Sequence, residues 1–181
     1  MSTKTEATIE DLYKVEGKAE LVSGEIVHMS PTGQEPGYAS REILFSLHQY
    51  ERQTKRGYAI GDNVGFKVNL PHRKSFSPDA AFYVGELKGM KFFEGAPVFA
   101  AEVRSEGDYG PKAEEAMTRK RADYFAAGTQ VVWDVDLLSE TPVRVFRAGE
   151  PENPTLYRRG EMGEAEPALP GWTMPVDDLF V

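Results

Sequence analysis

Two short apolar segments, each carrying a single carboxylate, most constrain what this chain can fold into. In the first, Pro78 and Asp79 lead into the run Ala-Ala-Phe-Tyr-Val of residues 80–84. In the second, residues 98–101 are apolar or small, and Glu102 and Val103 follow. Continuous apolar runs of this length are typical of strands buried on both faces of a sheet. A carboxylate there is costly unless it is protonated, paired or bound to a cation, so both acids are candidate functional residues.

Each acid also has a purely structural interpretation. Asp79 follows a proline and suits the cap of a turn, whereas Glu102 lies two residues before Arg104 and can pair with it or with another cation. Because buried acids are usually paired, both interpretations stay open for either acid alone. Two acids on neighbouring strands instead favour a hard-cation site, since Mg²⁺ is commonly held by one or two carboxylates plus water.

The rest of the chain alternates predicted strands and helices. Apolar spacing predicts a helix over 38–55 that ends at Gly57, and Pro111 begins a helix that ends at Gly128. Residues 19–29 are predicted to form a hairpin around Ser23 and Gly24. Further strands are predicted at 58–60, 64–70, 130–136 and 143–147, and loops at 31–37 and 85–95. This order predicts one α/β domain over residues 8–181, with a mixed sheet, a crossover helix after Glu102 and a β-rich end.

Composition excludes several classes of protein. The chain has 181 residues and no run of 18 apolar ones, so we expect no membrane span. It has no cysteine, which excludes disulfides, thiolate metal sites and cysteine nucleophiles. The N-terminus shows no apolar signal segment, and a cytoplasmic location is expected. The net charge of −8 counts against strong non-specific binding to nucleic acid but allows a local basic face.

The remaining chemistry favours metal-assisted hydrolysis. The sequence has no Gly-x-Ser-x-Gly elbow, no phosphate-binding Gly-rich motif and no His-rich metal spacing. What remains is Asp79, Glu102 and Lys120, which lies on the helix that follows the Glu102 segment. Such a set suits hydrolysis of a phosphodiester, in which a metal held by the carboxylates acidifies a water and the lysine stabilises the phosphorane.

The order of the motifs resembles a known family. Pro78-Asp79 is followed by Glu102-Val-Arg104, by Lys120 and Tyr124 on one helix, and then by Val132-Trp-Asp-Val-Asp, Pro170-Gly-Trp and Asp178-Leu-Phe. This order, with Glu20-Leu-Val-Ser-Gly-Glu as the opening motif, resembles the putative restriction endonucleases once filed as a domain of unknown function, which belong to the PD-(D/E)XK superfamily. The resemblance covers roughly residues 10–180. It implies a restriction-endonuclease-like mixed sheet flanked by helices, and a metal-dependent endonuclease that hydrolyses DNA with Mg²⁺ or Mn²⁺.

The resemblance also implies roles for individual residues. Asp79 and Glu102 are expected to be catalytic metal ligands, with Glu20 as a further acid at the metal. The superfamily lysine is expected two residues after the glutamate, where this chain has Arg104, and arginine stays charged and cannot act as a base. Lys120 is therefore expected to be the catalytic lysine, reaching from its helix toward Asp79. Arg104 is expected to contact phosphate or to form a salt bridge to Glu102.

Several alternatives remain open at this point. Tyr124 is expected to be a core residue rather than a catalytic one. Lys120 has the alternative of a solvated helix lysine, and the basic loop at 71–75 is expected to be a solvated turn unless it contacts phosphate. The expected partner is nucleic acid, and a homodimer is one possible assembly. The rival function is a catalytically inactive nuclease-fold binding or interaction module, which the net charge favours slightly.

Overall fold

The computed structural model describes residues 5–181. Its helices are α1 (Ile9–Leu12), α2 (Gln34–Thr54) and α3 (Pro111–Ala126), with a 3₁₀ helix, η1 (Val176–Leu179), near the C-terminus. The strands, in chain order, are β1 (Ala19–Val22), β2 (Glu25–His28), β3 (Tyr58–Ile60), β4 (Phe66–Lys67), β5 (Ser75–Phe76), β6 (Ala80–Tyr83), β7 (Phe93–Glu94), β8 (Phe99–Val103), β9 (Val131–Val135), β10 (Val143–Arg147), β11 (Glu150–Tyr157), β12 (Met162–Glu164) and β13 (Thr173–Pro175).

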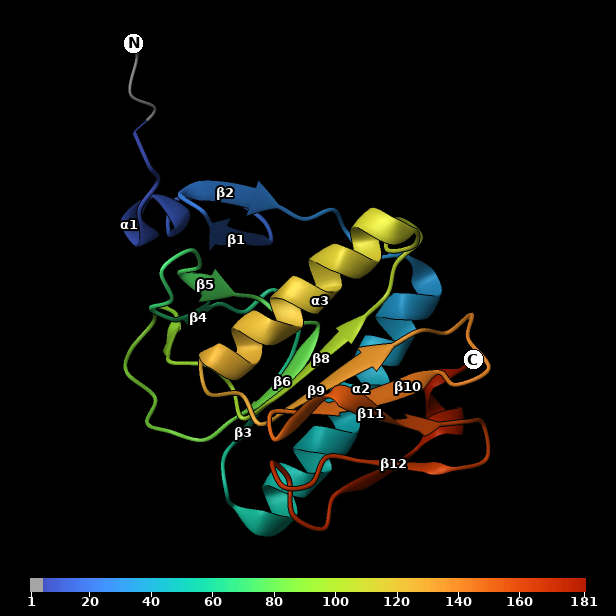
Figure 1. The fold of residues 1–181 in the computed structure, drawn as a ribbon. Coiled ribbons are helices and arrows are strands. Elements are labelled where there is room, and N and C mark those ends of the chain that lie inside the picture. Colours follow the sequence, from blue (N-terminus) through green and yellow to red (C-terminus); the bar gives the residue numbers. More distant parts are fainter. Residues whose placement is uncertain (1–4) are drawn as a thin grey trace.

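Six strands form a central mixed sheet in the order β11-β10-β9-β8-β6-β3. β8 and β9 pair in parallel, and the other neighbours in this sheet are antiparallel. A parallel pair needs a crossover connection, which α3 provides by crossing one face of the sheet, while α2 covers the opposite face (Figure 1). The predicted mixed sheet flanked by helices, with one crossover helix after Glu102, is therefore confirmed.

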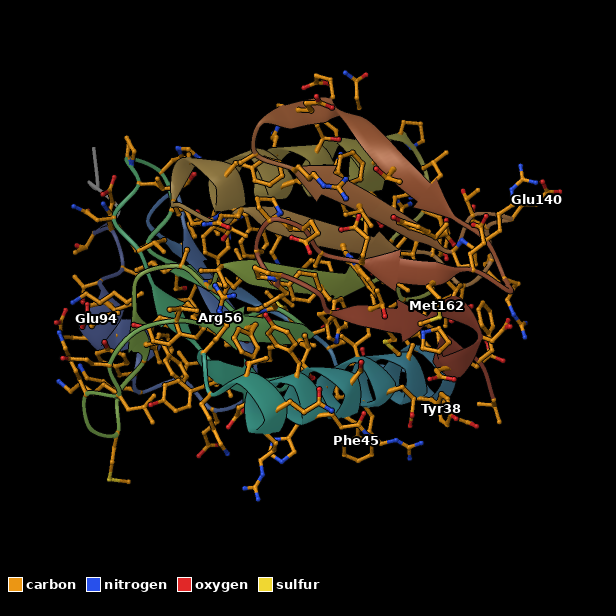
Figure 2. The ribbon with its side chains drawn as sticks, turned by 90° about the horizontal axis from the view of Figure 1, so that it is seen from below. Tyr38, Phe45, Arg56, Glu94, Glu140 and Met162 are labelled. Carbon is orange, nitrogen blue, oxygen red and sulfur yellow. The ribbon has the colours of Figure 1, made fainter. Side chains whose placement is uncertain are left out.

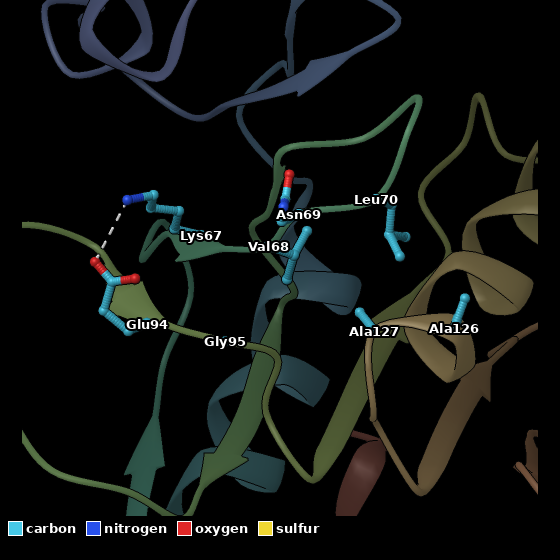
Figure 3. A pocket seen from close by; sticks show the side chains of 8 residues that line it. All are labelled: Lys67, Val68, Asn69, Leu70, Glu94, Gly95, Ala126 and Ala127. Atoms are coloured by element: carbon cyan, nitrogen blue, oxygen red, sulfur yellow. Dashed lines mark ion pairs between the residues drawn. The ribbon is translucent and has the colours of Figure 1, made fainter.

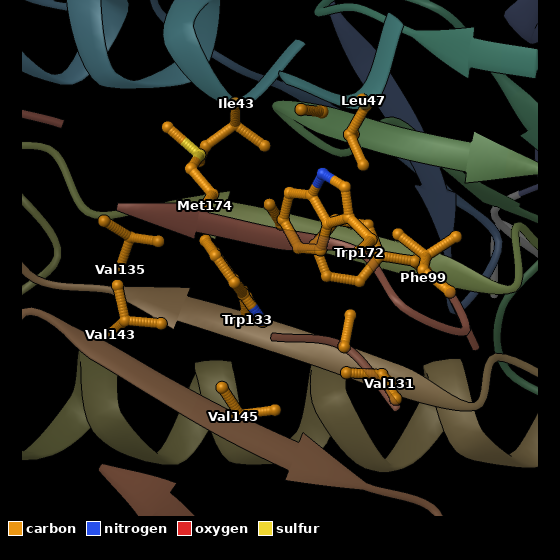
Figure 4. Close-up of a cluster of buried hydrophobic side chains, with 14 of the residues drawn as sticks. Ile43, Leu47, Phe99, Val131, Trp133, Val135, Val143, Val145, Trp172 and Met174 are labelled. Carbon is orange, nitrogen blue, oxygen red and sulfur yellow. The ribbon is translucent and has the colours of Figure 1, made fainter. Parts of the chain in front are cut away.

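Alternating residues of the central strands build two separate cores. On the α2 side, Phe99 and Trp133 pack with Ile43, Leu47 and Trp172, the last of which comes from the C-terminal segment (Figure 4). On the α3 side, a second cluster joins strand residues to α3 and to the small sheet of β4, β5 and β7; it includes Ala81, Ala100, Val132, Phe76 and Tyr124. Because both faces are covered, β8 and β9 are apolar almost throughout.

The N-terminal hairpin follows the prediction closely. Ser23 and Gly24 connect β1 to β2 with φ angles of 50° and 72°. Positive φ at both central residues is the requirement of a type I′ turn, whose twist matches that of paired strands. The hairpin lies beside β5, near one end of α3 (Figure 1).

Several predicted boundaries were wrong. α2 begins at Gln34, inside the predicted loop at 31–37, because Pro36 falls in the first turn, where a missing N–H costs no hydrogen bond. It ends at Thr54, and Lys55 rather than Gly57 is the left-handed cap, with φ of 56°. The predicted strand at 64–70 shortens to β4. The predicted loop at 85–95 contains β7, which pairs with β4 in parallel.

The outer side of α2 faces away from both cores. Tyr38 and Phe45 project from it (Figure 2), and Phe45 is 53% exposed. The Arg41 guanidinium lies 4.5 Å from the centre of the Tyr38 ring and 5.9 Å from that of Phe45, so it covers part of this aromatic surface. Within residues 5–181, no helix has the combination of length and apolar character needed to cross a membrane.

Candidate active site

The two acids of the strand segments lie opposite each other. Ala80 of β6 pairs with Ala101 of β8, so Asp79, one residue earlier, stands across from Glu102. The backbone N–H of Asp79 donates to the carbonyl of Ala101 at 3.1 Å, and Asp79 Oδ2 accepts the N–H of Val103 at 2.7 Å. Opposed residues of antiparallel strands have Cβ atoms roughly 4.5–5.5 Å apart on one face. The Asp79 carboxylate therefore makes a contact between strands rather than a cap of a local turn.

Lys120 lies between two acids. Its Nζ atom is 2.9 Å from Glu102 Oε1 and 2.9 Å from Glu20 Oε1, and its side chain is 18% exposed. The interpretation of Lys120 as a solvated helix lysine is thus wrong. Tyr124, one turn further along α3, donates its hydroxyl to the same Glu102 oxygen at 2.6 Å. Tyr124 is a core residue, as predicted, but its polar end also belongs to this site.

Asp79 has a different lysine from the one expected. Lys18, the residue before β1, places Nζ 2.7 Å from Asp79 Oδ1 and 2.7 Å from Asp62 Oδ1. No ion pair joins Lys120 to Asp79 in the described part of the chain, so the expected reach of Lys120 toward Asp79 was wrong. Lys120 is anchored instead by Glu20, whose place on β1 draws the ammonium toward the hairpin.

Glu20 is buried and fully engaged. Its Oε1 accepts the N–H of Ser77 at 2.8 Å as well as contacting Lys120, and its Oε2 accepts from Arg73 Nη1 at 2.7 Å. Arg73 Nε in turn donates to Asp123 Oδ2 at 2.8 Å, and Arg73 is only 6% exposed. The expected solvated turn at 71–75 is therefore wrong at Arg73, which points inward and holds Glu20.

Arg104 forms a salt bridge, but not with Glu102. Its Nε and Nη2 atoms donate to the two carboxylate oxygens of Asp134 at 2.9 Å each, and it also pairs with Glu114 at the start of α3. The Arg104 side chain is 2% exposed. Among the described ion pairs, none joins Arg104 to Glu102, so the expected partner was wrong. The bidentate pair with Asp134 joins the end of β8 to β9, and the pair with Glu114 joins it to α3.

Burial and charge together set the protonation of the cluster. Burial raises the pKa of Glu102, and the Lys120 ammonium opposes this rise while Asp79 and Glu20 add to it. Burial also raises the pKa of Glu20, but Lys120 and Arg73 more than offset it and bring that pKa below its usual value. Burial lowers the pKa of Lys120, but Glu102 and Glu20 outweigh it and raise that pKa above its ordinary value. Lys120 is therefore an ammonium that donates hydrogen bonds and stabilises negative charge.

The donor set fits a two-carboxylate cation site. Within residues 5–181, no group of three or more His, Cys, Asp or Glu side chains has the geometry of a metal site. Asp79 and Glu102 remain as a facing pair, and one or two carboxylates with water are what Mg²⁺ commonly uses. Burial is the largest cause of the raised pKa of Glu102 and the charge of Asp79 adds to it, so a cation bound near the pair would favour the ionised form.

Two cavities lie near the candidate site, and the residues that line them do not include Lys18, Glu20, Asp79, Glu102 or Lys120. One cavity, of about 320 Å³, is lined by Leu12 of α1, Gly17, Ala19, Asn63 and Ser77, together with residues 90–92. A second cavity, of about 350 Å³, lies between β4, Gly95 and the end of α3, where Lys67 and Glu94 form an ion pair (Figure 3). The residues that line this second cavity do not include members of the cluster.

Sequence reasoning missed Lys18 and Arg73 as parts of the cluster. Lys18 precedes Glu20 by two residues at the start of a predicted strand, and residues two apart on a strand face the same side. The same spacing relates Arg73 to Ser75, whose Oγ accepts the N–H of Leu21. This periodicity was a usable signal for side-chain direction, although it does not identify the partner.

The fold and the acid–lysine cluster together define a restriction-endonuclease-like protein. The family model for putative restriction endonucleases matches residues 7–177, nearly the whole chain. The chain belongs to this family. A search of curated proteins found no significant match.

A solved structure gives the same result for the fold. The crystal structure of a putative nuclease from Anabaena variabilis ATCC 29413, assigned to a domain family of unknown function, aligns with a TM-score of 0.74. The alignment covers 96% of this chain and 97% of that one, at 16% sequence identity. At this identity the likeness establishes a shared fold.

Proposed function

We propose that residues 8–181 form one nuclease domain that hydrolyses phosphodiester bonds in DNA and depends on Mg²⁺ or Mn²⁺. The observation that carries the proposal is the facing pair of Asp79 and Glu102, with the Lys120 ammonium 2.9 Å from Glu102. Family membership supports a nuclease, and it makes nucleic acid the expected substrate.

Each residue of the cluster has a role in this proposal. Asp79 and Glu102 hold the metal, which when bound acidifies a water and offsets charge on the phosphate. Lys120 stays protonated between its two acids and stabilises the negative charge that develops on the phosphate oxygens. Glu20, expected as a further acid at the metal, has both oxygens engaged by Lys120, Ser77 and Arg73, so we assign it the positioning of Lys120.

The test is cleavage of supercoiled plasmid DNA by the purified protein. We expect nicked and linear products with Mg²⁺ or Mn²⁺ and none with EDTA. Asp79→Asn and Glu102→Gln should each abolish cleavage because each removes a ligand charge. Asp178→Asn is a matched control, since Asp178 is an exposed acid on η1. This variant should cleave DNA at the wild-type rate. Cleavage that persists in EDTA would show that the reaction needs no metal.

The rival proposal is a nuclease-fold module that binds a partner without cleaving it. Two observations favour it: the net charge of −8, and the presence of Lys18 and Lys120 on the same acids that would hold a metal. Two results together would select the module. The wild-type protein would cleave neither duplex DNA, single-stranded DNA nor RNA with either metal, and Asp79→Asn would bind these nucleic acids as tightly as wild type does.

A further inference from the structure

We propose that Lys18 is a cation latch on Asp79: it bridges Asp79 and Asp62, occupies the Asp79 oxygen that a metal ion would use, and keeps only its contact with Asp62 when the ion binds. The inference rests on the proposed function, because it concerns the same metal site. It adds a residue outside the expected set, and it makes metal binding an exchange of one cation for another.

The first step is that the two carboxylate oxygens of Asp79 have different partners. Oδ2 accepts the backbone N–H of Val103 at 2.7 Å, a contact that ties β6 to β8. Oδ1 is the oxygen that Lys18 contacts, also at 2.7 Å. Oδ1 is thus the oxygen that can hold a metal without sharing the contact between the strands. Lys18 already contacts this oxygen, so a metal ion has to displace the ammonium from it.

The second step is the presence of an alternative partner. The same Lys18 Nζ atom is 2.7 Å from Asp62 Oδ1. The Asp62 side chain is 46% exposed, whereas that of Asp79 is 14% exposed, so the two acids offer Lys18 an outer and an inner position. A lysine stem has four rotatable carbons, and its ammonium can stay on Asp62 after it leaves Asp79.

The third step is that the backbone of Lys18 does not have to move. Its carbonyl accepts the N–H of Met29 at 2.9 Å, which holds it to the second strand of the hairpin. The release of Asp79 is thus a change of the Lys18 side chain alone. Because an ammonium and a divalent cation repel each other, the affinity for metal depends on how readily Lys18 gives up Asp79.

The test is isothermal titration calorimetry, which measures the affinity of the full chain for Mn²⁺ or Mg²⁺ in the absence of DNA. Lys18→Met keeps the length of the side chain and removes the competing charge, so we expect its affinity for metal to rise at least tenfold. Lys14→Met is the matched control, because Lys14 is 76% exposed and pairs with Asp11, away from the site. Its affinity should stay within twofold of wild type.

A second arm separates the latch from simple charge effects. Asp62→Asn removes the outer position, so Lys18 stays on Asp79 and metal affinity should fall at least fivefold. In a Lys18→Met background the same Asp62→Asn change should alter affinity by less than twofold, because there is no lysine left to transfer. A double-mutant cycle of this kind isolates the coupling between the two residues. Asp62→Asn alone remains informative if Lys18→Met fails to fold.

The outcomes distinguish the latch from the proposed function. Wild-type protein that binds metal, loses it on Asp79→Asn and shows no gain on Lys18→Met would overturn the latch and leave the metal site standing. An equal effect of Asp62→Asn in both backgrounds would also overturn the latch. If neither wild type nor Lys18→Met binds metal, both the latch and the proposed metal site fail.

Discussion

At the scale of single residues, the two basic side chains of the motif region have different partners. Lys120 contacts Glu102 and Glu20 in the candidate site, whereas Arg104 is bound to Asp134 and Glu114. In the superfamily pattern the position of Arg104 is that of the lysine. The structure thus puts the lysine that lies beside the acids on α3, and Arg104, which follows β8, forms an ion pair with Asp134.

The variants Lys120→Met and Arg104→Met test this separation. We expect Lys120→Met to lose at least about a hundredfold in the rate of DNA cleavage, the usual scale for one transition-state donor. We expect Arg104→Met to lose less in rate but to lower the free energy of unfolding by about 3 kcal/mol, because it leaves Asp134 buried with only Arg121 and Arg144 beside it. Single-turnover cleavage and urea unfolding measure the two effects. The reverse ranking in cleavage would give the catalytic role to Arg104.

At the scale of elements, α3 joins the site to the core through Tyr124. The Tyr124 ring stacks on Phe76 of β5 with a centroid distance of 4.0 Å and an angle of 13° between the planes. Its hydroxyl bonds to Glu102 of β8, and Lys120 lies one turn earlier on the helix. The position of Lys120 therefore depends on the packing of α3 against β5 and β8.

Tyr124→Phe should separate the ring from its hydroxyl. The stacking on Phe76 is kept, so we expect the free energy of unfolding to fall by only about 1.5–3 kcal/mol, the contribution of one hydrogen bond to a carboxylate. Tyr124→Ala also removes the ring and should cost about 3–5 kcal/mol. Tyr58→Phe, at a site that is 36% exposed, is the control and should change stability by less than about 0.5 kcal/mol. Equal losses for Tyr124→Phe and Tyr124→Ala, measured by urea unfolding, would contradict this account.

The same elements show how far the sequence could predict the structure. Local signals were sufficient for these elements: continuous apolar runs for β8 and β9, the Ser-Gly turn for the hairpin, and Pro111 and Gly128 for the limits of α3. The Asp79–Glu102 pair followed from the motif order. The contacts of Lys18 with Asp79 and of Arg73 with Glu20 span 61 and 53 residues, and no local pattern specifies such partners. The limits of α2 depended on Pro36 and Lys55, whose tolerance at helix ends is a matter of backbone geometry.

At the scale of the whole molecule, the two faces of the sheet serve different purposes. The α3 face carries the acids and lysines of the candidate site, together with the buried ion pairs that hold them. The α2 face is an apolar core that the C-terminal segment completes with Leu169, Trp172, Met174, Val176 and Leu179 (Figure 4). Stability and function should therefore respond to different substitutions.

Trp172→Ala tests this division on the α2 face. Trp172 is 4% exposed, its ring centre lies 5.0 Å from that of Trp133 and 5.5 Å from that of Phe99, and its Nε1 donates to Ser46 Oγ at 3.0 Å. Removing so large a buried ring should lower the free energy of unfolding by about 3–5 kcal/mol. Urea unfolding followed by circular dichroism measures the loss.

Leu138→Ala is the control for this experiment, because Leu138 is 78% exposed and its loss should cost less than about 0.5 kcal/mol. In water, the affinity of Trp172→Ala for Mn²⁺ should equal that of wild type, since the carboxylates of Asp79 and Glu102 bond to Val103, Lys18 and Lys120, and α2 contacts Asp79 at its backbone carbonyl, which accepts from Ser40 Oγ at 2.8 Å. A metal affinity that falls in proportion to stability would show instead that the sheet transmits the disturbance from one face to the other. The candidate site would then depend on the whole core and not on its own ion pairs.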